Sequence, residues 1–541
     1  MPVGGSIMEL ISVQYALFVA VALFIYYLFP KKKQWIVLLA ASYLYYLLIC
    51  NKYIIYMLVT TVSTYFGARL IDAFKNRQNE VVKAHKAEWT REEKKSYKQK
   101  NLKKRRGILI AVLLLNFGIL GFLKYFHFVA ELICDALSIF GLHFMAPELG
   151  LLLPLGISFY TFQTMGYLID VYQEKVPAEK NIARLALFVS FFPQIIQGPI
   201  AMYDELAGQL YEEHDFDYDC LKNGALLVLW GAFKKMVIAD RAVKMINVVT
   251  ADPKAFSGTF VLAAALMYAL QLYADFSGGI DIVRGIAQMF GITMAENFRR
   301  PYFSKSLTEY WHRWHITLGN WVRNYVFYPL SISKKFLDMG KWMKPKFGKH
   351  IAKVVPTSIA SLLTFLIIGL WHGANSKYVA FGLWNGGVIM VLELLRPVND
   401  KIGDLLHINR KGKCYQIAAM LWTFVLVLIG YYFDIAKSFS SACDMLYRSV
   451  TDLHLSDFYA GSVLAQSGLD WMDYLVIFAG AVVILIASVI QERTGRNIRD
   501  MLMEKKLLVQ WACIFAGIFA ILIFGFYGPG MDPAEFVYMQ F

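Results

Sequence analysis

The sequence predicts an all-α protein that crosses a membrane many times. Of its 541 residues, 57% are apolar and 17% are charged, whereas soluble globular domains average about 45–50% apolar and about 25% charged residues. Apolar stretches close to or longer than the roughly 18 residues needed to cross a bilayer recur along the whole chain. We therefore expect a single membrane domain, residues 1–541, built of roughly 11–13 transmembrane and re-entrant helices.

The N-terminal helices, residues 1–74, are expected to form three spans, at about 8–29, 34–50 and 53–74. The first apolar stretch is too long for a secretion signal, no basic segment precedes it and no small-residue cleavage site ends it, so we expect this helix to be retained. Residues 75–106 follow with thirteen Lys or Arg against four acidic residues. This composition predicts a basic cytoplasmic loop that is solvated and partly helical.

Positive charge also predicts the orientation of the chain. The net charge is +14; a second cluster, residues 331–353, holds seven Lys and one Asp, whereas residues 438–471 hold one Arg and four Asp. Because Lys and Arg concentrate on the cytoplasmic side, both clusters should face the cytoplasm and both termini should lie outside the cell membrane; the family resemblance described below implies that this is a bacterial plasma membrane. With no nucleic-acid-binding motif, the clusters are expected to contact anionic lipid headgroups and not nucleic acid. The later spans are expected at about 355–371, 378–396, 414–435, 472–490 and 507–527.

The middle of the chain, residues 107–396, is interpreted as the functional core, followed by C-terminal helices at 397–527 and an outward-facing tail at 528–541. Pro and Gly interrupt the core in "LLLPLGIS", "FFPQIIQGPI" and "YADFSGGID", and broken backbone at membrane depth is tolerated only inside protein or beside a watery cavity. The sequence shows no internal repeat, Walker loop, dinucleotide fingerprint or Cys/His metal spacing. We expect neither a metal nor a bound cofactor.

Two histidines are candidates for chemistry inside the membrane, where ionisable residues are costly and usually functional. His315 lies in "EYWHRWHITLGNW" and His372 in "GLWHGANSKY", 16 residues before and 19 residues after the cluster 331–353. If both connecting stretches are helical, the two residues lie roughly 24 and 28 Å from the cytoplasmic side, at similar depth. Such a pair suits acyl transfer: one neutral imidazole takes the proton of an attacking hydroxyl, and the second imidazole or a nearby donor stabilises the oxyanion. The alternative is that both histidines only form hydrogen bonds between helices.

Several blocks resemble, in the same order, those of the membrane-bound O-acyltransferase (MBOAT) family, and above all its bacterial alginate O-acetylase branch. They are "LPLGISFYTFQTMGYLIDVY", "FFPQIIQGPI", "YADFSGGIDI", "PYFSKSLTEYWHRWHITLGNWVRNYVFYPL" and "LWHGANSKYVAFGLWNG", and they cover at least residues 150–390. The resemblance implies that His372 is the general base and that His315 is the second histidine needed for transfer. It also implies an acyl thioester donor, such as acetyl-CoA, that enters from the cytoplasm and an acceptor that enters from outside. The sequence departs from the branch at His312 and Ser376, which bear on the acyl group or partner accepted.

Other core residues have two interpretations each. Arg313 either points toward a phosphate-bearing donor or pairs with a buried carboxylate, for which Asp275 is the favoured candidate. Asn375 either orients His372 or caps the end of a helix.

The aromatic and amide candidates are more often structural. Trp311 and Trp371 are expected to be packing walls, of which one or both could line the acyl pocket. Gln194 and Gln197 flank a Pro-Gly break, where we expect them to satisfy loose backbone groups and not to bind substrate.

The end of the chain, "AEFVYMQF", resembles the F-x-Y-x-x-F ending found in the same branch. The resemblance implies that Tyr538 receives the acyl group and passes it to an exported SGNH-hydrolase-like serine acyltransferase. The alternative is that these aromatics anchor the tail at the membrane interface.

The predicted function is that of a multi-pass O-acyltransferase, specifically an O-acetyltransferase, that acts on an exported cell-envelope polysaccharide. A D-alanyl transferase for teichoic acids is the alternative within the family. A small-anion transporter with a basic polar core is the alternative of another class.

Overall fold

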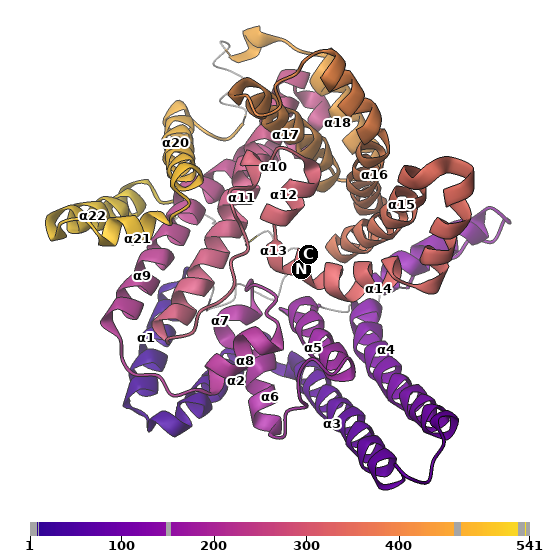
Figure 1. The fold of residues 1–541 in the computed structure, drawn as a ribbon. Helices are drawn as coiled ribbons and strands as arrows, with labels where there is room; N and C mark the ends of the chain where they lie inside the picture. Colours follow the sequence, from indigo (N-terminus) through magenta and orange to yellow (C-terminus); the bar gives the residue numbers. More distant parts are fainter. Residues whose placement is uncertain (1–7, 9, 148–152, 459–466, 528–535, 537–541) are drawn as a thin grey trace. The chain divides into compact units, whose positions relative to one another are not determined.

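The computed structural model describes residues 8, 10–147, 153–458, 467–527 and 536 of the chain. The regular secondary structure of this part is helical (Figure 1). Phe298 and Trp314 form an isolated antiparallel β-bridge. Within the described residues, eight helical segments are long and apolar enough to cross a membrane, and a shorter apolar helix lies at Val13–Leu28. The all-α, polytopic fold class is confirmed.

The chain divides into two compact units. Unit 1 comprises Met1–Ala225 and Val283–Ala295, and unit 2 comprises Leu226–Ile282 and Glu296–Phe541. The expected core, residues 107–396, is shared between both units, so the single-domain interpretation stays a prediction.

Unit 1 is built mainly of the N-terminal helices. They are α1 (Val13–Leu28), α2 (Gln34–Cys50), α3 (Ile54–Ala84), α4 (Arg91–Ser138), α5 (Ile157–Tyr172), α6 (Ile182–Ser190), α7 (Phe192–Ile195) and α8 (Tyr203–Tyr211). The basic segment 75–106 is helical over most of its length, because α3 continues to Ala84 and α4 already begins at Arg91; this agrees with the expected partly helical segment, whose cytoplasmic position stays a prediction. A capping box explains the early start: the Thr90 hydroxyl accepts the Glu93 amide N–H, and the Glu93 carboxylate accepts the Thr90 N–H.

Unit 2 contains the remaining helices, and α9 and α11 contribute residues to both units. The elements are α9 (Tyr218–Ala232), the π-helix η3 (Phe233–Ala239), α10 (Asp240–Ala251), α11 (Gly258–Met289), α12 (Leu307–Arg313), α13 (Ile316–Val322), the π-helix η6 (Arg323–Phe327), α14 (Tyr328–Ser331), α15 (Lys334–His372), α16 (Ser376–Leu405), α17 (Lys413–Ile435), α18 (Phe439–Thr451), α20 (Trp471–Thr494), α21 (Ile498–Met503) and α22 (Leu507–Phe524). Short 3-10 turns join several of them, at Lys31–Lys33, Asn51–Tyr53, Pro253–Ala255, Pro301–Phe303 and Leu455–Phe458.

The lysine-rich segment 331–353 lies largely on helix α15, which bends at Gly348, where φ is +81°. Downstream of the bend, α15 runs to His372 and packs very closely on α16. A Cβ atom at Gly382 of α16 would lie 2.6 Å from the backbone oxygen of Phe365 on α15. Glycine at the contact therefore allows the two backbones to approach, as small residues do between membrane helices.

The expected helix breaks have different outcomes. "FFPQIIQGPI" does contain a break, because α7 lasts only from Phe192 to Ile195. "YADFSGGID" does not, since α11 runs through it without interruption. Its Gly278 faces α9 instead, where a Cβ atom would lie 2.9 Å from the backbone oxygen of Gly231. The glycine serves close helix packing, and the predicted interruption is wrong.

The segment that carries His315 is a chain of short helices, α12 to α14, and not one continuous helix. The depth estimate for His315 therefore does not hold, because it assumed 1.5 Å of rise per residue along an unbroken helix.

Candidate active site

His315 lies at the junction between α12 and α13, in the left-handed conformation with φ +45° and with 2% of its surface exposed. A non-glycine residue adopts this conformation only where its surroundings impose it, and such residues gather at functional sites. The surroundings here are a short paired segment: Phe298 bridges Trp314, and the Ile316 N–H donates to the Asn297 backbone oxygen at 3.0 Å.

The side chain of Asn297 determines which nitrogen of His315 carries the proton. Its Oδ1 atom accepts the Thr317 backbone N–H at 3.0 Å and lies 3.2 Å from His315 Nδ1. A backbone N–H can only donate, so the accepting atom is the amide oxygen, and His315 Nδ1 must donate to it. The neutral ring therefore carries its proton on Nδ1 and has its lone pair on Nε2.

His315 lies outside the helices that are long enough to cross a membrane. Burial lowers the pKa of its imidazole well below the usual value, and a positive charge on His372 would lower it further. The ring contacts Phe276 at a centroid distance of 4.9 Å and Trp371 at 6.0 Å. At neutral pH His315 is consequently uncharged.

His372 is the last residue of α15, and Trp371 brings it near His315. The Trp371 ring lies 5.2 Å from the His372 ring and 6.0 Å from the His315 ring, centroid to centroid. Phe381 of α16 packs against the other side of His372 at 5.3 Å. The two histidines predicted from the sequence thus belong to one cluster, with Trp371 as their common wall.

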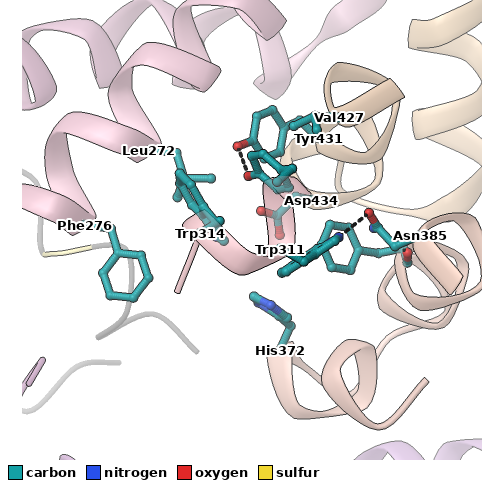
Figure 2. Close-up of a pocket in the computed structure, with 11 residues that line it drawn as sticks. Leu272, Phe276, Trp311, Trp314, His372, Asn385, Val427, Tyr431 and Asp434 are labelled. Atoms are coloured by element: carbon teal, nitrogen blue, oxygen red, sulfur yellow. Dashed lines mark hydrogen bonds between the residues drawn. The ribbon is translucent and has the colours of Figure 1, made fainter. Parts of the chain in front are cut away.

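A small cavity of about 20 Å³ adjoins His372. Figure 2 shows the imidazole pointing from the end of its helix toward Trp311, whose Nε1 donates to Asn385 Oδ1 at 3.1 Å. Asp434 also lines the cavity, and its Oδ2 atom accepts the Tyr268 hydroxyl at 2.6 Å. The other lining residues are apolar or aromatic: Leu272, Phe276, Tyr310, Trp314, Phe381, Val427 and Tyr431.

Arg313 pairs with carboxylates, but not with the one we expected. Its guanidinium lies 2.7 Å from Glu309 on the same helix and 3.1 Å from Glu492 on α20. Asp275 is fully buried on α11, where its Oδ1 atom lies 2.6 Å from Lys235 Nζ. The predicted Arg313–Asp275 pair is wrong, because Arg313 pairs with Glu309 and Glu492, whereas Asp275 pairs with Lys235.

The remaining candidates divide between structural roles and the wall of the cavity. Asn375 caps α16, since its side chain accepts the Lys377 backbone N–H at 3.1 Å. Trp311 and Trp371 are walls, as expected, and Trp311 lines the cavity.

Gln194 and Gln197 belong to unit 1. Gln194 donates to the Pro199 backbone oxygen at 2.7 Å, which is the backbone role we expected. Gln197 is fully buried, but its side-chain amide makes no hydrogen bond within the described residues, so the expected contact with backbone groups is wrong for Gln197. Tyr538 lies outside the described residues.

Sequence reasoning missed Asn297, Asp434 and Lys235. The partner of each lies far along the chain: 20, 166 and 40 residues away for the hydrogen bonds to Thr317, Tyr268 and Asp275. No spacing within one helix or loop signals such a contact.

Comparison with known proteins identifies the family. The family model for MBOAT, the membrane-bound O-acyltransferase family, matches residues 179–343. A probable alginate O-acetylase, AlgI, of Pseudomonas syringae pv. tomato is 32% identical over 416 residues, which cover 77% of this chain and 70% of that protein. The chain belongs to the MBOAT family.

Two further relatives are named for other acceptors. The peptidoglycan O-acetyltransferase of Helicobacter pylori is 30% identical over 447 residues, covering 77% of this chain and 73% of that protein. The teichoic acid D-alanyltransferase of Bacillus subtilis is 28% identical over 294 residues, covering 53% and 69%. This MBOAT protein is therefore a membrane O-acyltransferase, and the transporter alternative is not supported.

Proposed function

We propose that this enzyme transfers an acetyl group from a cytoplasmic thioester, acetyl-CoA or a related acyl donor, to hydroxyl groups of an exported cell-envelope polysaccharide. The observation that carries the proposal is the His315–Trp371–His372 cluster beside a cavity of about 20 Å³. A cavity of this size holds about one water-sized group, which suits the methyl end of an acetyl group better than a longer acyl chain. The relatives named as alginate and peptidoglycan O-acetylating enzymes support the same class of acceptor.

His372 is assigned as the general base. Its imidazole accepts the proton of the attacking hydroxyl while a new C–O bond forms at the thioester carbonyl. The tetrahedral intermediate then collapses, the C–S bond breaks, and the departing thiolate recovers the proton from His372. The histidine returns to its neutral form, so the proton transfers of this step need no metal.

His315 is assigned to orient the hydroxyl. The sequence also suggests a role as donor to the oxyanion, but a neutral ring with its proton on Nδ1 can only accept through Nε2. An acceptor at this position aligns a hydroxyl group for attack. The same tautomer prevents His315 from donating until the ring is protonated, which burial opposes.

The first acceptor in this proposal is the phenol of Tyr538. Its hydroxyl attacks the thioester, and His372 takes the proton, which gives an aryl ester at the C-terminus. A serine of an exported SGNH-hydrolase-like acyltransferase then attacks this ester, and the phenol leaves with the serine proton. The acyl group passes from this serine to a hydroxyl group of the polysaccharide. Because phenoxide is a good leaving group, the second transfer, from the tyrosyl ester to the serine, is favourable.

The orientation is part of the same proposal. The charge distribution supports a multi-pass protein of the bacterial inner membrane with its N- and C-termini outside and with residues 75–106 and 331–353 in the cytoplasm. The donor then reaches the histidines from the cytoplasm, and the tail lies on the side where the polymer is modified.

D-alanyl transfer is a second candidate function, and one observation favours it. Asp434 lines the cavity beside His372, and a carboxylate there could pair with the ammonium group of a D-alanyl ester. The similarity to a teichoic acid D-alanyltransferase points the same way, although it covers only 53% of the chain.

Mass spectrometry of envelope polymers tests the proposal, in cells that lack the gene or carry the wild type, His372→Ala, His315→Ala or Tyr538→Phe. We expect polymer-bound acetyl groups in the wild type and a fall to the deletion level in all three variants, at unchanged protein abundance. The mass of the added group separates acetyl from D-alanyl transfer. Full acetylation in a well-expressed His372→Ala strain would refute the assignment of the base; full acetylation with Tyr538→Phe would refute only the relay, since that change keeps the ring and removes the hydroxyl.

A further inference from the structure

A buried ionic cluster occupies the π-helix η3 and its neighbours in unit 2. Lys235 is fully buried, and its Nζ atom lies 2.6 Å from Asp275 Oδ1 and 2.8 Å from Asp240 Oδ1. Removing three charges from water is costly and is tolerated only where the groups pair well. A π-helical turn is itself uncommon and is often found at functional sites. The cluster therefore calls for an explanation beyond the packing of helices.

The ring of Phe536, near the C-terminus, covers this cluster. Its centroid lies 4.3 Å from Lys235 Nζ, and only 3% of the residue is exposed. An aromatic face attracts a cation most strongly where both are removed from water. A ring buried on a buried ammonium is not in the position of an interfacial membrane anchor, the alternative interpretation of this aromatic ending.

The chain is also attached to the same π-helix ten residues earlier, where it leaves α22. The Phe526 backbone N–H donates to the Met236 oxygen at 2.8 Å, and Lys244 Nζ lies 4.3 Å from the centre of the Phe526 ring. Phe526 and Phe536 thus contact the neighbouring residues Met236 and Lys235. The C-terminal segment is held at two points of η3.

Two consecutive residues of α11 connect this attachment to the active site. Asp275 pairs with Lys235, beneath Phe536, and Phe276 places its ring 4.9 Å from that of His315. A single turn of α11 therefore contacts both Lys235, on which Phe536 lies, and the buried His315.

We propose that Phe536 docks the C-terminal tail on Lys235 and thereby positions Tyr538 for acyl transfer. The positioning part rests on the proposed relay; the docking part does not. Two residues of chain reach at most about 7 Å, so a docked Phe536 restricts Tyr538 to the neighbourhood of the cluster. Phe536 and Lys235 are positioning residues in this proposal, since neither contacts the acyl group.

Two separate measurements on purified full-length protein in detergent test the docking and the positioning. Docking is measured as the rate at which carboxypeptidase A removes the C-terminal Phe541, and positioning as the amount of acyl-Tyr538 formed from labelled acetyl-CoA, by peptide mass spectrometry. Phe536→Ala should accelerate the digestion and reduce acyl-Tyr538, each by about tenfold or more, because a buried cation–aromatic contact is lost. Phe536→Trp, which keeps an aromatic face, should restore both, whereas Phe536→Leu, which keeps only apolar bulk, should restore them in part.

Phe519→Ala is the matched control, because Phe519 is an aromatic residue on α22 with 55% of its surface exposed. We expect it to change neither measurement. Lys235 is left intact in this design, since its removal would leave Asp240 and Asp275 as neighbouring buried carboxylates and could prevent folding.

The outcomes separate the inference from the function on which it rests. Equal digestion of wild type and Phe536→Ala would refute docking. Faster digestion with unchanged acyl-Tyr538 would refute positioning. Absence of acyl-Tyr538 in the wild type would refute the relay and with it the positioning, while the digestion rates would still decide the docking.

Discussion

One amide oxygen determines the chemistry of His315. Asn297 Oδ1 accepts three hydrogen bonds, from the Thr317 N–H, the Thr317 hydroxyl and His315 Nδ1. The Thr317 contacts fix the orientation of the amide, and the amide in turn fixes the tautomer of the ring. In the proposed mechanism, Asn297 is thus a positioning residue that acts through His315.

The first prediction at this scale concerns Asn297. Asn297→Ala should lower the rate of acetyl transfer by at least about tenfold without loss of folded protein, because the imidazole loses the partner that holds its proton on Nδ1. Asn297→Asp keeps an acceptor and should restore part of the rate. Its added negative charge favours the imidazolium, so the pH–rate profile should move to higher pH. A wild-type rate and profile in both variants would show that the tautomer is irrelevant to transfer.

At the scale of elements, the hairpin of α15 and α16 places His372. The close contact at Gly382 has no room for a methyl group against the Phe365 backbone oxygen, at 2.6 Å, whereas a Cβ atom at Gly387 would meet nothing within 4 Å. His372 lies seven residues beyond Phe365 on the same helix, so any displacement at the contact reaches the histidine.

These glycines provide a matched pair of variants. Gly382→Ala should destabilise the folded protein by about 1–3 kcal/mol, since backbone atoms must move to accept the methyl group. Gly387→Ala should be neutral or slightly stabilising, because alanine favours the helix and meets no neighbour. Thermal unfolding followed by size-exclusion chromatography measures both. Equal melting temperatures for the two variants would contradict the tight helix contact.

The sequence predicted some elements well and others poorly, for identifiable reasons. Apolar length revealed the spanning helices, and the motif around His315 and His372 revealed a pair that Trp371 does bring together. Charge content could not show where α4 begins within 75–106, because a capping box and not composition determines that start. Of the two partners of Arg313, Glu309 lies four residues away on the same helix, a spacing that the sequence shows, whereas Glu492 lies 179 residues away on another helix and could not be predicted.

At the scale of the whole molecule, the proposed topology makes a prediction about accessibility. Lys95 on α4 and Ser456 after α18 are both exposed to solvent in the structure. In a background without other reactive cysteines, Ser456→Cys should react with an impermeant maleimide in intact cells, and Lys95→Cys should react only after permeabilisation, because Lys- and Arg-rich segments stay in the cytoplasm. The opposite labelling pattern would reverse the orientation of the protein.

The length of α4 has an electrostatic consequence. Its 48 residues extend about 72 Å, more than twice the roughly 30 Å hydrocarbon core of a bilayer. The basic part, residues 91–106, alone accounts for about 24 Å, or three screening lengths of about 8 Å at physiological ionic strength. With the apolar part in the bilayer, the far end of this arm lies beyond the reach of the headgroup charges. In the proposed topology, lipid headgroups can therefore contact only the part of this arm next to the bilayer, and dissolved counter-ions neutralise its far end.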